Sequence, residues 1–580
     1  MGKKIQFVDQ TIRDAQQSLW GFLMSTEMIT PIAPIMDEVG YKVVATVGGN
    51  GYVVQSRYYG EDPWERIRLV SRALSRTPMR GSYMTASLAS FDVDTPRDVI
   101  ALWIRRSVAN GVKGFWICDY QNDTESFYHF GKLAKELGAE VVTSLMYTSS
   151  PAHDAAHWAK KTRQIAELKE YVDSIMIEDA SGVLTPESTR GFLATVKEHC
   201  DGIPLEFHMH CNSGLAPLCY LEAIRMGVET VHTAVAPLAN GTSLPSTESI
   251  LRNARRLGYA ADVDEGALEA VSSHFRKIAE ERGFPIGTPE EYDLFHYEHQ
   301  VPGGMRSNLK RQLKELGMEH RLDEVLEEVV HVRRDLGYPV MATPFSQIVG
   351  VQAVENVVSG ERYQRVPDTV VKYVMGFYGE PAAPIDPNVR DRILELPEAK
   401  KLREWQPTNR YRPLEELRRE VGPELTDDEL LLRILIPGRS AAAGKAKARP
   451  PSAPPVAKGQ PALPSAFPMA FEVEVDGEVF DVKITPAGET AAAPSPGSPE
   501  PRKTKSDSPG AVVAGMGGMV VSIKARLGEK VNPGDPIATI EAMKMLRDVA
   551  APHGGVVEEI LVSDGDMVDP EHVLMVVGLP

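Results

Sequence analysis

The sequence is poor in cysteine and has no long apolar run. Its four cysteines show no Cys-x-x-Cys spacing, which argues against a disulfide framework and a structural zinc finger; they are Cys118, Cys200, Cys211 and Cys219. No stretch reaches the roughly 18 consecutive apolar residues that cross a bilayer. The chain also opens without a charged-then-apolar leader. These absences predict a cytoplasmic protein, associated with a membrane only through a partner.

Positive charge is in short supply as well. Lys and Arg number 63 against 80 Asp and Glu, which gives a formal net charge of −17. Nucleic-acid binding needs clustered cations at the phosphates, so we expect no nucleic-acid partner. The hydrophobic fraction of 43% is that of a globular protein. At roughly 100–200 residues per domain, the chain holds several domains, or one large barrel with additions.

Two segments lack the apolar residues that a folded core needs. Residues 439–468 consist mostly of Ala, Pro, Lys and Gly, and residues 486–509 mostly of Ala, Pro, Ser, Glu and Lys. Both compositions are typical of linkers. Between them, residues 469–485 alternate apolar and polar side chains around an Asp-Gly pair, which predicts a short β-hairpin.

Short apolar runs alternate with helical segments through residues 1–288. This α/β pattern predicts eight parallel strands closed into a (β/α)8 TIM barrel. The runs are residues 5–8, 41–47, 81–87, 112–118, 140–146, 172–177, 203–210 and 229–235. Residues 289–438 show mainly helical periodicity, with apolar side chains at i, i+3, i+4, i+7 and i+8 from Leu322. We expect this region to be a helical extension of the barrel.

Residues 510–580 show a third pattern, in which Val- and Ile-rich runs are broken by glycine. The pattern predicts a small all-β domain. Near its middle, Lys544 stands between Met543 and Met545. Such a lysine suits a hairpin tip that carries a group, and the same residues alone would also describe an ordinary exposed loop.

The Ala-Met-Lys-Met sequence at 542–545, followed by Ala-Pro at 551–552, resembles the attachment motif of biotinyl carrier domains. The resemblance implies a barrel-sandwich fold, covalent biotin on Lys544 between Met543 and Met545, and a biotin protein ligase as partner. Lipoyl domains usually place an acidic residue where this chain has Met543. A linker of ~25 residues reaches about 25–30 Å when flexible, which would let the carrier swing.

Polar residues gather at two predicted strand ends of the barrel, the face where TIM-barrel chemistry takes place. Asp14 follows the first strand, and His208 and His210 end the seventh. Two histidines at i and i+2 on a strand point to one face and have the spacing of metal ligands. A pair of hydrogen-bonded core histidines would show the same spacing.

Longer segments resemble the carboxyltransferase domain of biotin-dependent enzymes, which include pyruvate carboxylase in its one-chain form and as a separate B subunit, transcarboxylase and the oxaloacetate decarboxylase alpha subunit. The last of these shares the order of barrel, helical region, linker and carrier. The resemblance is carried by residues 11–18, 48–49, 61–66, 122–123, 241–243, 297–304, 343–347, 359–363 and 379–381.

This resemblance implies a divalent metal (Zn, Mn or Co) that polarises the substrate carbonyl, with Asp14, His208 and His210 among its ligands. The family's fourth ligand is a carbamylated lysine, and this chain has Glu178 at that position. Because Glu178 also presents a carboxylate, we expect it to be the fourth ligand. Cys211 is the alternative, although it should face away from the two histidines.

Three further residues match family positions around the substrate. Thr242 matches a threonine that passes a proton between substrate and biotin, and Arg13 and Gln17 match positions near substrate and metal. A departure lies at the end of the fourth strand, where Trp116 replaces an arginine that helps to hold the 2-oxo acid. An indole cannot pair with a carboxylate as a guanidinium does, which favours a bulkier, less anionic or thioester substrate.

We therefore predict a carboxyltransferase or decarboxylase subunit that moves carboxyl between carboxybiotin on Lys544 and a small carboxylic acid, either a 2-oxo acid or an acyl derivative. Because the chain shows no Gly-rich phosphate loop, we expect a separate biotin carboxylase subunit or a membrane decarboxylase subunit as partner. The family implies a homodimer through the barrel. The alternatives are a metal-dependent lyase or aldolase-type barrel, and a carrier or scaffold subunit with an inactive barrel.

Overall fold

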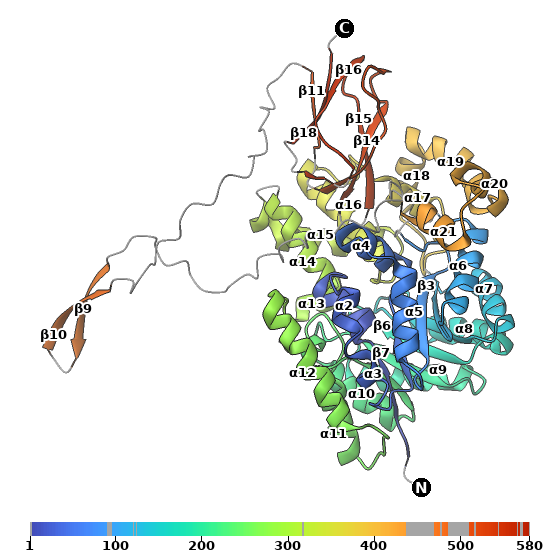
Figure 1. The fold of residues 1–580 in the computed structure, drawn as a ribbon, viewed down its shortest axis with the longest axis vertical. Helices are drawn as coiled ribbons and strands as arrows, with labels where there is room; N and C mark the ends of the chain where they lie inside the picture. The colour runs from blue at the N-terminus through green and yellow to red at the C-terminus, as the bar shows by residue number, and fades with distance from the viewer. Residues whose placement is uncertain are drawn as a thin grey trace.

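Eight parallel strands close into a barrel in the computed structural model, in sequence order from β1 to β8 (Figure 1). The strands are β1 (Gln6–Asp9), β2 (Val43–Ala45), β3 (Met79–Met84), β4 (Gly114–Cys118), β5 (Glu140–Met146), β6 (Ser174–Asp179), β7 (Leu205–Met209) and β8 (Thr230–Thr233). The structure describes residues 3–89, 95–119, 121–122, 124–315, 318–436, 469–475, 478–484, 510–515, 518–542, 545–564, 566–568 and 572–578.

The barrel closes because β8 pairs in parallel with β1, with Val8 opposite His232. Each strand overlaps one of the predicted apolar runs, so the expected (β/α)8 barrel is confirmed. The outer helices wrap the strands, as Figure 1 shows. They are α4 (Gly49–Tyr59), α5 (Pro63–Ala73), α6 (Arg97–Ala109), α7 (Thr124–Glu136), α8 (Ala155–Ala166), α9 (Pro186–His199), α10 (Ala216–Arg225), α11 (Thr247–Arg256) and α12 (Glu265–Arg282).

Side chains of β4 alternate between two different apolar cores. Phe115 and Ile117 belong to the large core shared with the outer helices. Trp116 and Cys118 belong to a second core, which contains other barrel residues and the apolar faces of the helices after residue 300. Since alternate residues of a strand point to opposite faces, this second core joins the barrel interior to the helical region.

The helical region after the barrel contains nine α-helices among its described residues. They are α13 (Leu294–His299), α14 (Gly303–Glu315), α15 (Leu322–Asp335), α16 (Phe345–Ser359), α17 (Asp368–Val374), α18 (Pro387–Leu394), α19 (Pro397–Arg410), α20 (Leu414–Val421) and α21 (Asp427–Leu435). The predicted helical run from Leu322 forms α15. The last two helices return to the barrel, where Leu417 and Leu430 join the large core.

The C-terminal region is all β, as expected, with two four-stranded sheets in the orders β11-β18-β16-β13 and β15-β14-β12-β17. Its strands are β11 (Ala511–Val513), β12 (Gly518–Ile523), β13 (Lys530–Val531), β14 (Pro536–Ala542), β15 (Met545–Ala550), β16 (Gly555–Ile560), β17 (Met567–Val568) and β18 (Val573–Val577). A separate antiparallel pair consists of β9 (Met469–Val475) and β10 (Glu478–Ile484).

Two of the three carrier residues lie outside the described residues. Strand β14 ends at Ala542 and pairs with Met545 at the start of β15, whereas Met543 and Lys544 are not described. The same holds for the predicted linkers. No helix among the described residues is both long and apolar enough to cross a membrane.

Candidate metal centre

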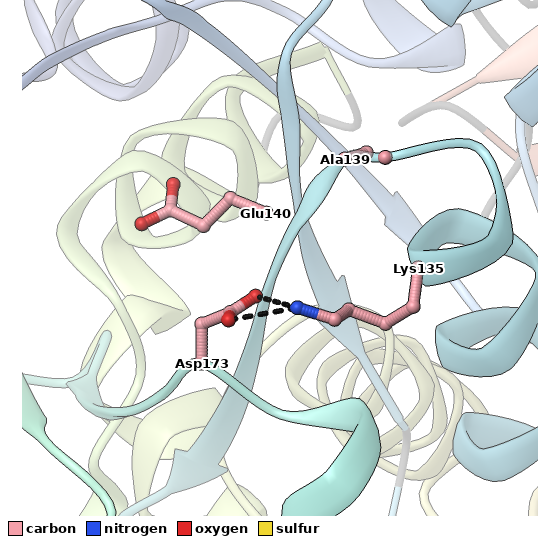
Figure 2. Close-up of a pocket in the computed structure, with 5 residues that line it drawn as sticks. Lys135, Ala139, Glu140 and Asp173 are labelled. Atoms are coloured by element: carbon pink, nitrogen blue, oxygen red, sulfur yellow. Dashed lines mark hydrogen bonds and ion pairs between the residues drawn. The ribbon is translucent and has the colours of Figure 1, made fainter.

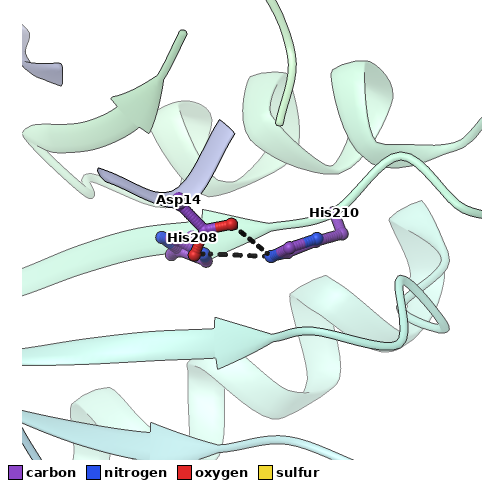
Figure 3. A group of neighbouring side chains, drawn as sticks. All are labelled: Asp14, His208 and His210. Carbon is purple, nitrogen blue, oxygen red and sulfur yellow. Dashed lines mark hydrogen bonds and ion pairs between the residues drawn. The ribbon is translucent and has the colours of Figure 1, made fainter. Parts of the chain in front are cut away.

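Two strand ends bring a carboxylate and two imidazoles together inside the barrel. After β1 the chain turns into a one-turn π-helix, η1 (Thr11–Ala15), a local irregularity often found at functional sites. It carries Asp14, while His208 lies in β7 and His210 directly follows it. Figure 3 shows the three side chains pointing toward one another. All three residues are buried, and the predicted trio is therefore brought together.

The spacing of the three groups suits one metal ion. His208 Nε2 lies 3.4 Å from His210 Nε2. The carboxylate oxygens of Asp14 lie 3.6 Å from His208 Nε2 and 3.3 Å from His210 Nε2. Tetrahedral ligands at about 2.1 Å from an ion are about 3.4 Å apart. Two imidazole nitrogens and a carboxylate also form a donor set that Zn, Mn or Co accepts.

The hydrogen bond on the far side of the His210 ring favours the same arrangement. His210 Nδ1 lies 2.7 Å from the carbonyl oxygen of Thr242. A carbonyl only accepts hydrogen bonds, so Nδ1 carries the proton and donates it. In the neutral ring Nε2 is then free of hydrogen and turns its lone pair toward Asp14.

Asp14 stays ionised in this setting. Burial alone would raise the pKa of Asp14, but the charge of Arg13 and a hydrogen bond from Ser18 work against it, and the pKa lies below its usual value. Ser18 Oγ donates to Asp14 Oδ1 over 2.9 Å, and Arg13 Nη1 donates to the other oxygen. A fixed anion is therefore available at the centre.

Glu178 stands beside the trio without belonging to it. It is paired with His208 in the register of β6 and β7, but the clustered ligand atoms come only from Asp14 and the two histidines among the described residues. Burial raises the pKa of Glu178 to about 7, against the lowering effect of Arg13. Its Oε2 is buried and makes no hydrogen bond. Cys211, the alternative ligand, packs in the large core shared with the outer helices. This agrees with the expectation that it faces away from the two histidines.

Trp116 and Arg13 form one unit next to His208. The guanidinium carbon of Arg13 lies 4.0 Å from the centre of the Trp116 ring, and Arg13 Nε donates to Ser82 Oγ over 3.2 Å. The Trp116 ring also lies 5.4 Å from the ring of His208. Its Nε1 is buried without a hydrogen-bond partner. The residue that departs from the family pattern thus lies directly at the centre.

The remaining predicted residues occupy the rim. Thr242 Oγ1 donates to the carbonyl of Ser18 over 2.9 Å, which ties the loop after β8 to α1 (Gln16–Trp20). Gln17 lies on α1 and is partly exposed. Ser18 therefore connects Thr242 to Asp14, whereas Gln17 takes no part in the hydrogen bonds that hold Asp14.

Sequence reasoning missed a buried polar group behind His208. His232 in β8 and Glu206 in β7 are both fully buried, as is Arg80 in β3. The signal was present, because Glu206 stands between Leu205 and Phe207 and His232 follows Val231, in an interior that usually holds branched apolar side chains. No motif singled them out.

A separate cavity of about 350 Å³ lies where β5 and β6 begin, away from the strand ends that carry the trio. Figure 2 shows its lining, in which Lys135 Nζ donates to both carboxylate oxygens of Asp173. Glu140 completes its charged wall. The Lys135–Asp173 pair neutralises itself, so the metal centre is the stronger functional site.

Three family models match successive parts of the chain. The model described as HMGL-like matches residues 4–274, the one described as a conserved carboxylase domain matches residues 297–487, and the one described as a biotin-requiring enzyme matches residues 504–577.

Curated relatives match nearly the whole length. The B subunit of pyruvate carboxylase from Methanocaldococcus jannaschii is 37% identical over 554 residues, which cover 93% of this chain and 94% of the relative. The 2-oxoglutarate carboxylase large subunit of Hydrogenobacter thermophilus is 31% identical over 608 residues, which cover 95% and 91%. The carboxyl transferase domain of Rhizobium etli pyruvate carboxylase, solved with pyruvate, has the same fold, with a TM-score of 0.67 and 23% identity over 75% of this chain and 76% of that one.

Proposed function

The chain belongs to the family of biotin-dependent carboxyltransferases that contains the B subunit of pyruvate carboxylase, and from this membership we propose the reaction that it carries out. It moves a carboxyl group between biotin on Lys544 and a 2-oxo acid at the metal centre of the barrel. The observation that carries the proposal is the convergence of Asp14, His208 and His210 in a chain that also matches the biotin domain.

Asp14, His208 and His210 would hold the divalent ion, which when bound polarises the ketone oxygen of the substrate. Glu178 would be the fourth ligand, replacing the lysine of the family. Two observations support this role: its buried, unpaired Oε2 is costly to leave without a partner, and it is paired with His208 in the register of β6 and β7.

Arg13 would hold the substrate carboxylate. Its guanidinium is fixed by Asp14, Ser82 and the Trp116 ring, and a guanidinium has five N–H groups, so donors remain for a carboxylate. Gln17, next along the exposed side of α1, would contribute at the rim. Thr242 would pass a proton between substrate and biotin through Oγ1, once that hydroxyl leaves the carbonyl of Ser18.

Trp116 sets the class of substrate in this proposal. It offers an apolar ring where the family has a second cation, so one carboxylate can be paired, by Arg13, while an apolar substituent packs on the indole. The relatives are named for pyruvate and 2-oxoglutarate. We propose a 2-oxo acid with a single carboxylate close to Arg13.

The reaction needs other proteins. The relative from Methanocaldococcus jannaschii is named as one subunit of its enzyme. We propose that a separate biotin carboxylase subunit loads the biotin, and that a biotin protein ligase attaches it to Lys544. A membrane decarboxylase subunit would instead remove the carboxyl group in the reverse direction. The barrel would form a homodimer, as the resemblance implies.

Intact mass spectrometry of the biotinylated full chain tests the proposal. The protein is incubated with oxaloacetate, malonyl-CoA or methylmalonyl-CoA, and Lys544→Ala serves as the blank. We expect one carboxyl-group mass gain with the carboxylated 2-oxo acid and none in the blank. A chain that takes up no biotin when co-produced with the ligase would refute the carrier role. Metal-dependent cleavage that survives in Lys544→Ala would favour the lyase alternative instead.

A further inference from the structure

His208 is joined to the buried polar group formed by His232 and Glu206. Its Nδ1 lies 3.1 Å from His232 Nδ1. On the other side of that second ring, His232 Nε2 lies 2.8 Å from Glu206 Oε2. The three side chains therefore form one continuous path from the candidate metal centre into the barrel interior, and all of them are fully buried.

Two cations hold Glu206 as a carboxylate at the end of this path. Arg80 Nη1 donates to Glu206 Oε2 over 2.7 Å, and Lys42 Nζ donates to Oε1 over 3.0 Å. Both contacts are ion pairs in the buried interior, and two cations on one carboxylate favour its ionised form. An ionised carboxylate only accepts hydrogen bonds, so the proton between Glu206 and His232 belongs to His232 Nε2.

The position of that proton determines the rest of the path. With its proton on Nε2, the His232 imidazole has an acceptor at Nδ1. The side-chain amide of Gln10 supports the acceptor, because its Nε2 lies 2.9 Å from the same Nδ1. When His208 Nδ1 shares this acceptor with Gln10, it is the donor toward His232, and the neutral His208 ring then has no proton on Nε2.

We propose that His232, held by Glu206, is a positioning residue that fixes the tautomer of His208 and presents its Nε2 lone pair to the metal. The inference rests on the proposed function, since it concerns the same metal centre. The Thr242 carbonyl fixes His210 in the same way from the other side. Both histidines are thus set to bind through Nε2 before any ion arrives, as metal-ligating histidines are when their other nitrogen is fixed.

A purely structural role for His232 is the competing explanation. Glu206 also balances the charges of Arg80 and Lys42, and removing any member of a buried polar network costs stability. Apolar side chains could fill this interior without such a network. The test therefore has to separate the acceptor that faces His208 from the general packing of the ring.

His232→Asn and His232→Leu form a matched pair. The two side chains have the same shape, and both lose the bond to Glu206, but only asparagine keeps an oxygen near the place of Nδ1. The full chain is freed of metal with a chelator and titrated with Co²⁺, followed by its ligand-field absorption. We expect His232→Leu to weaken Co²⁺ binding by about 10–100-fold, and His232→Asn to bind more tightly than His232→Leu by about tenfold.

The outcomes are distinguishable. Equal Co²⁺ affinity in the two variants, whether both are weakened or neither is, would overturn the proposal, because the acceptor would then have no effect. Free energies of unfolding of the metal-free variants show whether both folds survive. If unaltered protein binds no Co²⁺ through histidine, the proposed metal centre fails, and not the tautomer assignment alone.

A second measurement needs no folded variant at position 232. In metal-free wild-type protein labelled with ¹⁵N-histidine, NMR reads which nitrogen of each ring carries the proton, and His208→Asn identifies the His208 signals. We expect the proton of His208 on Nδ1. A proton on Nε2 would overturn the proposal whatever the Co²⁺ titration shows.

Discussion

Arg13 lies against the face of Trp116, with its guanidinium carbon 4.0 Å from the centre of the ring. A cation on the face of a buried indole gains about 2 kcal/mol from the ring quadrupole. The residue that departs from the family pattern thus supports the cation next to it. Stacking on Trp116 thus helps to hold the Arg13 guanidinium, at a position where the family pattern has an arginine in place of the indole.

Removing the Trp116 ring should therefore weaken substrate binding through Arg13. We expect Trp116→Ala to lower kcat/KM for the 2-oxo acid by roughly 30-fold, the equivalent of about 2 kcal/mol of stacking. Trp116→Phe keeps an aromatic face and should lose clearly less. Steady-state kinetics of the biotinylated chain measure both, and equal losses in the two variants would contradict the orienting role.

Asp14 should be required for the metal. Asp14→Asn keeps the shape of the side chain but removes the anion, so we expect the metal affinity to fall by more than about tenfold. Elemental mass spectrometry of purified protein gives the metal content. Asp262→Asn is the control, because Asp262 is an exposed aspartate that pairs with Lys4; a similar loss there would remove the significance of the first result.

Glu178 should contribute a metal ligand. Glu178→Gln leaves an amide oxygen in place of a carboxylate, and we expect a metal affinity between those of wild type and Asp14→Asn. Glu178→Leu tests the other possibility, that the Glu178 carboxylate is buried but binds no metal. In that case the leucine variant would bind Co²⁺ as wild type does and would be more stable, because an unpaired buried polar group would be gone.

His153 should make the fold sensitive to acid. Burial, ahead of the repulsion from His157, lowers the pKa of His153 to about 3, whereas an unfolded histidine titrates near 6.5. The unfolded chain therefore binds more protons below pH of about 6.5, and stability falls as the pH drops from there toward the folded pKa. The slope from this residue is at most about 1.4 kcal/mol per pH unit.

Chemical denaturation at several pH values checks this slope. Between about pH 6 and pH 4, the free energy of unfolding should fall less steeply in His153→Gln, by a slope that corresponds to up to one proton. The control is His320→Gln, because His320 is exposed. An unchanged slope in His153→Gln would show that the buried ring does not cause the acid sensitivity.

Asp428 should anchor the end of the helical region to the barrel. Its Oδ1 accepts from Arg106 Nε over 2.6 Å, and its carbonyl accepts from Trp64 Nε1 over 3.1 Å. The Arg106 pair is partly exposed, so we expect Asp428→Ala to lower the free energy of unfolding by about 1 kcal/mol. Asp427→Ala is the control. It removes the ion pair with Arg418, which lies within the helical region, and it should leave the amide hydrogen exchange of α6 at the wild-type rate.

Sequence patterns predicted much of the fold and the centre of the site. Asp14, His208 and His210 could be found because each lies at or just after the carboxyl end of a predicted strand, and these ends meet at one face of a barrel. The relation of Trp116 to Arg13 could not be found, because Arg13 lies in η1 after β1 and Trp116 lies in β4, and only closure of the barrel brings them together. The same applies to the return of α21 onto α6, which joins the helical region to the barrel core.

The sequence by itself determined the order of barrel, helices and β domain, since hydrophobic periodicity is a local property of the chain. It also supplied the biotin motif and the ligand types. Only the tertiary structure decided that Glu178 stands outside the trio and that His232 and Glu206 stand behind His208. Those relations depend on the register between neighbouring strands and on which side chains share the barrel interior. Neither can be predicted from a local sequence pattern.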